Sequence, residues 1–236
     1  MNIASKIAVV TGASSGLGAA CSKILVQKGA RVYGLARSAE RLNKLHSQLG
    51  ERFIPVSLDI TEQNKLREWV DKTFSKNQSP NILINNAGAG YFGKIDEISA
   101  DHWHQMINTN LNAIFYLTSA LVPFMKSNES IDHIINIGSI LGKTSGAEKS
   151  GYSATKYAIQ GYSEALFKEL RGNGIKVTCL NPGSIETHFF ESSGIEPHNN
   201  MLQPSELAEL VSYILETPDN LLIDELTVRP LNARPS

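Results

Sequence analysis

Short apolar runs alternate with longer amphipathic stretches along this chain of 236 residues. Apolar and β-branched runs of this kind are typical of buried strands. Seven runs fit that description: residues 6–11, 30–36, 52–58, 81–86, 133–138, 176–181 and 225–230. Between them lie stretches such as residues 62–77, where apolar residues recur at three- and four-residue steps, the period of a half-buried helix. The alternation predicts an α/β fold, a doubly wound (Rossmann-type) parallel sheet of about seven strands flanked by six principal helices.

The chain contains no internal repeat, low-complexity tract or linker rich in Pro, Gly and Ser. The sequence therefore predicts a single domain over residues 1–236. The least regular stretch is residues 184–203, where Gly194, Pro197 and the pair Asn199–Asn200 interrupt any long element. Such a stretch is either a small lid over a substrate site or an ordinary surface loop with one short helix, and both interpretations stay open.

Composition and charge narrow the function classes. Hydrophobic residues make up 42% of the chain, and the formal net charge is -1. A nucleic-acid-binding protein normally carries a basic surplus, so we expect no nucleic-acid partner. No apolar run has the length of a membrane span or of a secretory leader, so we expect a cytoplasmic protein with no membrane partner.

The cysteines and histidines show no metal-ligand spacing. Cys21 falls in a helical pattern and Cys179 in a strand-like run, and neither has a CxxC neighbour. Both are expected to be buried, reduced thiols. His102 and His104 lie two residues apart, which points them to different faces of a helix, and the other histidines are scattered. The sequence predicts no metal site.

The first strand-like run leads directly into "TGASSGLG", residues 11–18, and a helical pattern follows. Glycines in such a turn let the backbone approach a pyrophosphate, and the amides at the N-terminus of the helix then face the anion. The turn therefore predicts a phosphate-binding loop, although a flexible turn has the same composition. The predicted cofactor-binding residues of the loop are Gly12, Ser14, Ser15, Gly16, Leu17 and Gly18.

Three residues separate Gly12 from Gly16, which departs from the G-x-G-x-x-G spacing of many dinucleotide-binding folds. The order Thr-Gly-x-x-x-Gly-x-Gly resembles instead the nucleotide loop of the short-chain dehydrogenase/reductase family. The resemblance extends over nearly the whole chain, from the first strand to residues 225–230. It implies a single-domain oxidoreductase that binds NAD(H) or NADP(H).

Arg37 and Ser38 follow the second predicted strand, where dinucleotide-binding folds contact the adenosine ribose. An acidic residue there favours NAD(H), whereas a guanidinium can bind a 2′-phosphate through two parallel hydrogen bonds. Because Arg37 is present and no carboxylate stands at this position, the sequence predicts NADP(H). Ser14, Ser15 and Ser38 can add hydrogen bonds to that phosphate. In the alternative interpretation, Arg37 is a solvated surface arginine that pairs with Glu40 or with nothing.

Two more short motifs follow predicted strands. Asp59 and Ile60 come after the third strand, and in the family the acidic residue of this pair accepts from the adenine amino group while its neighbour lines the ring. A role for Asp59 as a helix N-cap is the alternative, and the two roles can coexist. The motif "NNAG" follows the fourth strand. The resemblance places Asn86, Ala87 and Gly88 against the adenosine side of the cofactor.

Tyr152 and Lys156 open the long helical pattern after the fifth predicted strand. A spacing of four residues places both side chains on one face of a helix. A tyrosine hydroxyl has a pKa of about 10, and a neighbouring cation lowers that pKa because it favours the phenolate. The pair therefore predicts that Tyr152 acts as a general acid and base, with its pKa lowered by Lys156.

Ser139 ends the fifth predicted strand, where its hydroxyl can hydrogen-bond a substrate carbonyl oxygen. Asn110 matches the family's helix asparagine, which bends the local backbone and holds a water linked to the lysine. The resemblance thus implies a catalytic tetrad of Asn110, Ser139, Tyr152 and Lys156. Tyr152 and Lys156 are expected to contact the cofactor as well. Tyr-x-x-x-Lys alone is a short and degenerate pattern, so the prediction depends on the order of all the motifs along the chain.

The sixth predicted strand leads into "NPGSIET", residues 181–187. The resemblance assigns four of these residues to the nicotinamide: Pro182, Gly183, Ile185 and Thr187. Pro182 with Gly183 also fits an ordinary turn. Apolar side chains near the motifs indicate a substrate with an apolar or aromatic part, or else they belong to the core. The pocket candidates are Tyr91, Ile140, Leu141 and Phe189.

Together the motifs predict an enzyme that reduces a ketone or aldehyde to an alcohol, or catalyses the reverse, with hydride from NADPH and a small-molecule substrate. A 3-oxoacyl-carrier-protein reductase is less favoured, because residues 86–96 lack the arginine that those enzymes commonly carry after NNAG. A non-catalytic, NADP(H)-sensing protein of the same fold is the alternative. The resemblance also implies a homodimer or homotetramer, formed through the helices that contain Asn110 and Tyr152.

Overall fold

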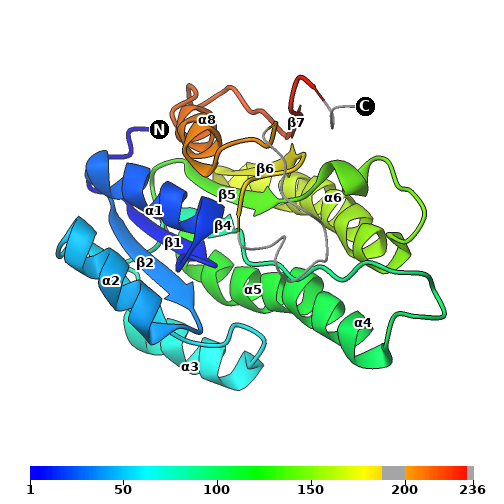
Figure 1. Ribbon diagram of the computed structural model, residues 1–236. Helices are drawn as coiled ribbons and strands as arrows, with labels where there is room; N and C mark the ends of the chain where they lie inside the picture. The colour runs from blue at the N-terminus through cyan, green and yellow to red at the C-terminus, as the bar shows by residue number, and fades with distance from the viewer. Residues whose placement is uncertain (188–199, 233–236) are drawn as a thin grey trace.

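The computed structural model describes residues 1–187 and 200–232, and Figure 1 shows their course. Within these ranges, seven strands form one sheet, and every pair of neighbouring strands is parallel. The strands are β1 (Ile7–Thr11), β2 (Arg31–Ala36), β3 (Phe53–Ser57), β4 (Ile82–Asn85), β5 (Asp132–Ile137), β6 (Ile175–Pro182) and β7 (Glu225–Val228). Each begins and ends within two residues of the apolar run that predicts it.

The order of the strands across the sheet is β3-β2-β1-β4-β5-β6-β7. β1 pairs with β2 on one side and with β4 on the other, so the winding direction of the chain reverses between β1 and β4. Ligands of open parallel sheets bind beyond the carboxyl ends of the strands at such a switch point. The predicted doubly wound α/β fold is confirmed.

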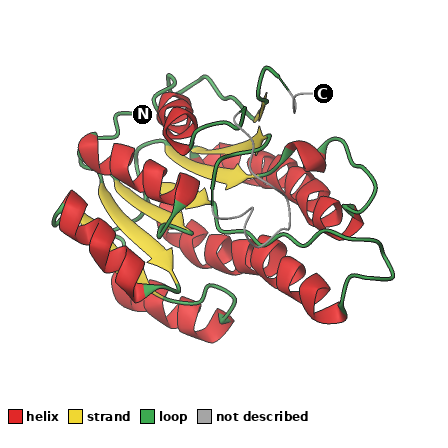
Figure 2. Ribbon diagram, in the orientation of Figure 1, coloured by secondary structure: helices red, strands yellow, loops and turns green. Residues whose placement is uncertain are grey.

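Helices cover both faces of the sheet, as Figure 2 shows. The layer on one face shares one apolar core cluster and holds α1 (Gly16–Gln27), α2 (Ala39–Leu49) and α8 (Pro204–Leu215). The layer on the other face shares a second cluster and holds α3 (Gln63–Thr73), α5 (Ala113–Met125) and α6 (Ser150–Leu170). α4 (Ala100–Ile107) continues through the π-helical turn η1 (Asn108–Asn112) into α5. Counted in this way, the described ranges hold the six principal helices that the sequence predicts.

The central strands are buried on both faces. Val10 of β1 and Ile84 of β4 pack into the cluster under α1, whereas Val9 and Leu83 pack into the cluster under α5. Alternate residues of a strand point to opposite faces, so a strand covered on both sides needs a continuous apolar run. This double coverage explains why the strands are visible in the sequence as unbroken apolar segments.

Both cysteines are buried free thiols, as predicted. Burial raises the pKa of the Cys21 thiol to about 12 and that of the Cys179 thiol to about 11. Neither residue therefore forms a reactive thiolate near neutral pH. In the described part of the chain, no helix has the length and apolar character needed to cross a membrane. The same residues include no group of three His, Cys, Asp or Glu side chains that could hold a metal ion.

Candidate active site

The carboxyl edge of the sheet brings together segments that lie far apart in the sequence. The loop after β1, the ends of β4, β5 and β6, and the beginning of α6 approach one another there (Figure 1). Each predicted site residue in the described ranges lies on one of these segments, at the end of β2 or β3, or in η1. The fold thus collects the predicted motifs along one edge.

The glycine loop makes a tight turn into α1. Gly16 has a φ of 52°, in the left-handed region that favours glycine. A Cβ on Gly18 would stand 2.3 Å from the carbonyl oxygen of Gly12, so only glycine lets α1 begin this close to β1. Ser15, the N-cap of α1, makes no side-chain capping hydrogen bond to a described residue, and the first turn of α1 carries no acidic residue. The first amides of α1 are therefore open to an anion.

The exit of β6 returns to this loop. A Cβ on Gly16 would stand 2.8 Å from Cγ2 of Thr187, which places this predicted nicotinamide contact directly beside the loop. Pro182 pairs with Val228 of β7, and the Gly183 amide donates to the Val228 carbonyl oxygen at 2.7 Å. Pro182 is therefore a strand residue, and the interpretation of an ordinary turn at this position is wrong.

The two ends of the irregular stretch 184–203 are paired with each other. The Leu202 amide donates to the carbonyl oxygen of Ser184 at 2.9 Å, and the Glu186 amide donates to that of Leu202 at 3.0 Å. Ile185 is half-buried and packs on the core cluster under α1 and α8. Residues 188–199 lie outside the described ranges, and the pocket candidate Phe189 is one of them.

Arg37 is exposed at the end of β2. Its guanidinium forms no ion pair with Glu40 or with any other residue that the structure describes. Ser38 is the N-cap of α2, and its Oγ accepts a hydrogen bond from the Arg41 amide at 3.3 Å. The Ser38 hydroxyl keeps its own proton for a further acceptor. The surface pairing of Arg37 with Glu40 is therefore not formed.

Asp59 folds back on its own turn. Its Oδ1 accepts from the Thr61 amide at 2.9 Å and from the Thr61 hydroxyl at 2.7 Å. α3 begins at Gln63 with Glu62 as its N-cap, so the interpretation of Asp59 as a helix N-cap is wrong. Ile60 is only 8% exposed and belongs to the core cluster under α3. Contacts of Asp59 and Ile60 with adenine stay a prediction.

Thr11 ties the turn after β4 to the end of β1. Its hydroxyl oxygen accepts from the amides of Asn86 and Ala87 at 2.9 and 3.0 Å. The Asn86 Nδ2 donates to the Thr11 carbonyl oxygen at 2.9 Å. Gly88 is exposed, and a Cβ there would lie 4.0 Å from Nζ of Lys156. The NNAG turn thus lies between the glycine loop and the predicted tetrad.

Asn110 is fully buried in the π-helical turn η1. Its Oδ1 accepts from the Ala89 amide at 2.8 Å. Its Nδ2 donates to the Ala89 carbonyl oxygen and to Oγ1 of Thr155, both at 2.9 Å. A π turn inserts one extra residue in a helix and so re-aims a side chain. Asn110 thereby joins the turn after β4 to α6. Its contact on α6 is Thr155, the residue before Lys156. The sequence does not identify Thr155 as a site residue, because its role depends on this contact with Asn110.

Ser139 lies at the end of β5 and is 8% exposed. Its Oγ accepts from the Leu141 amide at 3.1 Å, and its side chain lies close enough to the Tyr152 hydroxyl to lower the pKa of that hydroxyl. The Ser139 amide donates to Oδ1 of Asn181 on β6 at 3.2 Å. Asn181 is fully buried. It does not stand out in the sequence, because an asparagine before a proline is typical of a turn.

Lys156 lies one helical turn after Tyr152 and is 4% exposed. Its Nζ lies 5.6 Å from the centroid of the Tyr152 ring and donates to the carbonyl oxygen of Ile137 at 2.8 Å. The two side chains therefore share one face of α6, as their spacing predicts. Burial lowers the pKa of Lys156 to about 8, so the ammonium form still predominates at neutral pH.

The expected lowering of the Tyr152 pKa is wrong for this structure. Burial raises the pKa of the Tyr152 hydroxyl above its ordinary value, and the nearby Ser139 side chain offsets only part of that effect. The Lys156 ammonium lies over the ring and directs a hydrogen bond to Ile137. Tyr152 is therefore protonated at neutral pH, which is the form that a proton donor needs.

The two aromatic residues after β4 have different neighbours. Tyr91 stacks on His102 with ring centroids 3.9 Å apart, and its hydroxyl donates to Oε1 of Gln105 at 2.6 Å. Phe92 has its ring centroid 5.3 Å from that of Tyr152. Phe92, rather than the pocket candidate Tyr91, thus lies against the predicted catalytic tyrosine.

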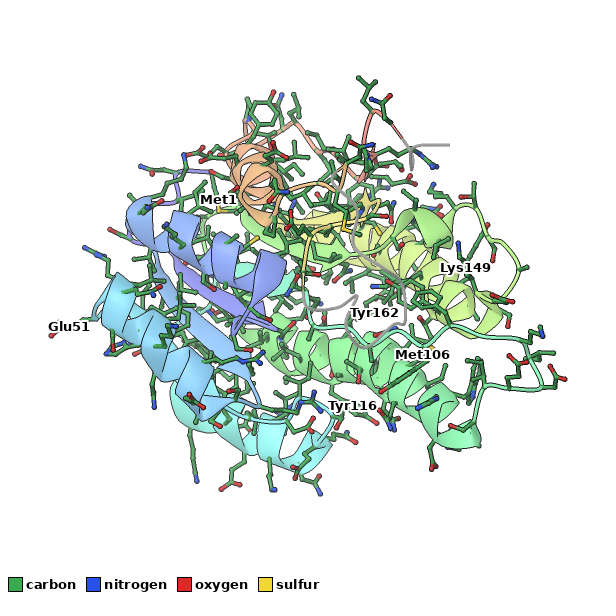
Figure 3. The ribbon with its side chains drawn as sticks, viewed as in Figure 1. Met1, Glu51, Met106, Tyr116, Lys149 and Tyr162 are labelled. Atoms are coloured by element: carbon green, nitrogen blue, oxygen red, sulfur yellow. The ribbon has the colours of Figure 1, made fainter. Side chains whose placement is uncertain are left out.

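Ile140 and Leu141 follow Ser139 in the short 3-10 helix η2 (Ile140–Gly142), and both are half-buried. A Cβ on Gly142 would stand 2.6 Å from the carbonyl oxygen of Lys156, so η2 lies directly against α6. Figure 3 shows the side chains of the molecule, with Met106 of α4 and Lys149, the residue before α6, labelled. A contact of Ile140 and Leu141 with substrate stays a prediction.

Known proteins are similar to this chain in sequence and in fold. The family model of short chain dehydrogenases matches residues 6–197. An uncharacterised oxidoreductase of Staphylococcus aureus is 35% identical over 228 residues, which cover 96% of this chain and 97% of the relative. The closed form of a serine dehydrogenase complexed with NADP+ is 30% identical, with a TM-score of 0.88 over 94% of this chain and 93% of that chain. A 3-ketoacyl-(acyl-carrier-protein) reductase from Brucella melitensis complexed with NADH is 25% identical, with a TM-score of 0.89 over 97% and 98%.

Proposed function

Because this chain belongs to the short-chain dehydrogenase family of oxidoreductases, we propose that it reduces a ketone or aldehyde to an alcohol, or catalyses the reverse, with NADP(H). One observation carries the proposal. The Ser139 side chain lies close enough to the Tyr152 hydroxyl to lower the pKa of that hydroxyl, and the Lys156 ammonium lies 5.6 Å from the tyrosine ring. This is a proton donor, a second hydrogen-bond donor and a cation in one cluster.

In the proposed reaction, Tyr152 donates the proton. The hydroxyl is protonated at neutral pH, as it is in a tyrosine of ordinary pKa, and it donates its proton to a substrate oxygen placed beside it. Ser139 hydrogen-bonds the same oxygen and stabilises the negative charge that develops there. The Lys156 ammonium then stabilises the phenolate left on Tyr152, because an opposite charge nearby favours the ionised form. A bound nicotinamide cofactor supplies the hydride.

The residues at the nucleotide end fit such a cofactor. The uncapped N-terminus of α1 and the close packing of Gly12 on Gly18 suit a pyrophosphate. We propose that the exposed Arg37 binds the 2′-phosphate and that Thr187, beside Gly16, contacts the nicotinamide end. The two solved relatives were complexed with NADP+ and with NADH, so the preference for NADP(H) in this chain rests on Arg37.

The proposed substrate is a small carbonyl compound, or its alcohol, with an apolar part. Phe92 beside Tyr152 and the half-buried Ile140 and Leu141 supply apolar surface next to the proton donor. The names of the two solved relatives add two compounds to test, an acyl thioester and a hydroxy amino acid. The acyl thioester is less favoured here, because residues 86–96 carry no arginine.

A substrate panel assayed with NADPH and NADH in parallel tests the proposal. The panel contains small aliphatic and aromatic ketones and aldehydes, a 3-oxoacyl thioester, and serine in the oxidative direction. We expect carbonyl-dependent oxidation of NADPH, with slower turnover on NADH. If NADPH binds tightly while no compound is turned over in either direction, the non-catalytic, cofactor-sensing protein is the better account.

We further propose that residues 184–203 form a lid over the substrate and that the protein is cytoplasmic. The pairing of Glu186 with Leu202 supports a lid whose two ends are held together.

A homodimer or homotetramer is proposed through α5 and α6, because Phe115 and Tyr157 are 54% and 47% exposed. Sedimentation velocity measures the assembly, and a monomer at assay concentration would contradict this last proposal.

A further inference from the structure

A surface depression of about 320 Å³ separates the glycine loop from α2. Ser14 and Ser15 line it from the loop, Ala19 lines it from α1, and Arg41 and Lys44 line it from α2. Two serine hydroxyls and two cations thus surround one hollow. No acidic residue lines it. A hollow of this composition suits an anion with several oxygens.

Arg41 and Lys44 are exposed, and neither forms an ion pair with a residue that the structure describes. Some exposed cations on other helices do have such partners. Arg67 and Lys72 pair with carboxylates four residues away on α3, and Lys168 does the same on α6. On α2, therefore, neither Arg41 nor Lys44 is within ion-pair distance of a carboxylate of a described residue, Glu40 included.

The two cations lie next to the place where the cofactor ribose is expected. Arg41 is in the first turn of α2, and its amide donates to Oγ of Ser38, the residue after Arg37. Arg41 and Lys44 are three residues apart on α2, which places their side chains on one side of the helix, and Arg37 lies two residues before α2 begins. In dinucleotide-binding folds, the 2′ position of the adenosine ribose lies at the end of β2. Arg37 stands at the end of β2, and Arg41 and Lys44 line the hollow from the helix that follows.

We propose that Arg41, assisted by Lys44, is a second determinant of the preference for NADP(H). Arg37 binds the 2′-phosphate from the end of β2, and Arg41 binds it from α2, across the hollow that Ser14 and Ser15 line. This inference rests on the proposed function, because it concerns the same cofactor. A phosphate monoester carries nearly two negative charges, so a single exposed guanidinium leaves part of its charge without a partner. The planar guanidinium of Arg41 can form two parallel hydrogen bonds, whereas Lys44 acts as a point charge.

Equilibrium binding of NADPH and NADH to the full chain tests the inference without any turnover. We expect Arg41→Ala to weaken NADPH about tenfold, the size of a charge-assisted contact, and Lys44→Ala to weaken it about threefold. Affinity for NADH should stay within about twofold, because NADH has no 2′-phosphate. Adenosine 2′-monophosphate, a probe that does not reach the nicotinamide end, should lose affinity in the same order.

Two further variants separate a phosphate contact from a general effect of charge. Arg31→Ala removes an exposed arginine at the start of β2, the opposite end of the same strand, and should leave both affinities unchanged. Arg41→Lys keeps the charge and should recover part of the NADPH affinity. Thermal unfolding of each variant checks that these exposed substitutions leave the fold intact.

The outcomes distinguish the two proposals. If the wild-type protein binds NADPH no better than NADH, the proposed cofactor preference fails and the role of Arg41 fails with it. If the wild-type preference is present, and Arg41→Ala and Lys44→Ala both keep it while Arg37→Ala loses it, only this inference is overturned. Equal weakening of NADPH and NADH by Arg41→Ala also overturns it, because that result shows a contact other than the 2′-phosphate.

Discussion

The two ends of the proposed cofactor groove differ in how far their side chains are buried and in how many contacts they make within the protein. At the chemical end, Ser139, Tyr152 and Lys156 are at most 8% exposed, and each side chain already contacts other groups of the protein. At the nucleotide end, Arg37 and Arg41 are exposed, and their guanidinium groups have no partner among the described residues. One end is built before any ligand binds, whereas the other offers free charges on the surface.

This difference follows from what each end has to do. Proton transfer depends on donor and acceptor positions that are fixed to a fraction of an ångström, so its groups are set by packing and by supporting hydrogen bonds. A cation that waits for a phosphate cannot be buried without a partner, because desolvation of an unpaired charge is costly. Substitutions at the chemical end should therefore affect turnover and folding, and substitutions at the nucleotide end should affect affinity alone.

The largest effect is expected at Tyr152. Tyr152→Phe removes the only hydroxyl of that side chain and keeps the ring that packs on Phe92. We expect kcat to fall about 10²- to 10⁴-fold, the usual contribution of a positioned general acid. NADPH affinity should change less than about threefold, because the proposed cofactor contacts are otherwise intact. Initial rates of NADPH oxidation and a binding titration on the same preparation measure both quantities.

Tyr91→Phe is the matched control for that experiment. It removes the hydroxyl of Tyr91, the residue before Phe92. That hydroxyl donates to Gln105, which lies outside the proposed site. Its kcat should stay close to that of the wild type. Substantial turnover in Tyr152→Phe would remove the proton donor from the mechanism, and an equal loss in both variants would indicate a general disturbance of the segment.

Asn110 is expected to give the next largest effect, on stability. Asn110→Ala leaves the amide and carbonyl of Ala89 without their Asn110 partners, and it removes the hydrogen bond that the Thr155 hydroxyl accepts. We expect the free energy of unfolding to fall by about 2–4 kcal/mol, because unsatisfied buried polar groups are costly. Urea denaturation measures the change. Asn112→Ala, in the same π turn, removes only the exposed hydrogen bond to Asn108 and should cost less than about 1 kcal/mol.

How much of this could be predicted differs between the architecture and the site. The strands can be recognised in the sequence because helices cover both faces of the sheet, which makes each strand an apolar run. Val9 and Val10, for example, pack into the core clusters on opposite faces. The motifs are visible because loops at the carboxyl edge need glycine, asparagine and proline at defined places. The arrangement of the tetrad along one edge then follows from the parallel sheet itself.

Three details of the site depend on tertiary contacts and have no local signal. The π turn at Asn110 is stabilised by Ala89, which lies 21 residues away. The choice between Tyr91 and Phe92 depends on which way an extended segment faces, and both are aromatic. The spacing of Tyr152 and Lys156 predicts that they share one face of a helix, but it does not predict how deeply they are buried. Burial at that depth raises the tyrosine pKa, which reverses the expected direction.

The buried lysine predicts a pH dependence of stability. Burial lowers the pKa of Lys156 from 10.5 to about 8, so between these pH values the unfolded chain binds a proton that the folded chain has released. The free energy of unfolding should therefore rise with pH across this window. Lys156→Met removes the titrating group. The wild type should gain on the order of 1–3 kcal/mol relative to Lys156→Met between pH 8 and pH 10.5.

Urea denaturation at a series of pH values measures that difference, with both proteins in the same buffers. A difference that stays constant from pH 8 to pH 10.5 would contradict a buried ammonium at this position. Below pH 8 both states hold the proton, and the curves for the two proteins should run parallel there. This window separates the lysine from carboxylates, which titrate at much lower pH.

The smallest of these effects is expected at Arg37, and it tests the other side of the comparison. Arg37→Ala should weaken NADPH about tenfold and leave NADH within about twofold, since the guanidinium is exposed and contacts no described residue. Thermal unfolding should be unchanged. A loss of stability in Arg37→Ala would show that the nucleotide end is also built from internal contacts, and the contrast with the buried tetrad would disappear. If Arg37→Ala instead leaves the discrimination between NADPH and NADH unchanged, the contrast between the two ends stands. The 2′-phosphate then binds a cation other than Arg37.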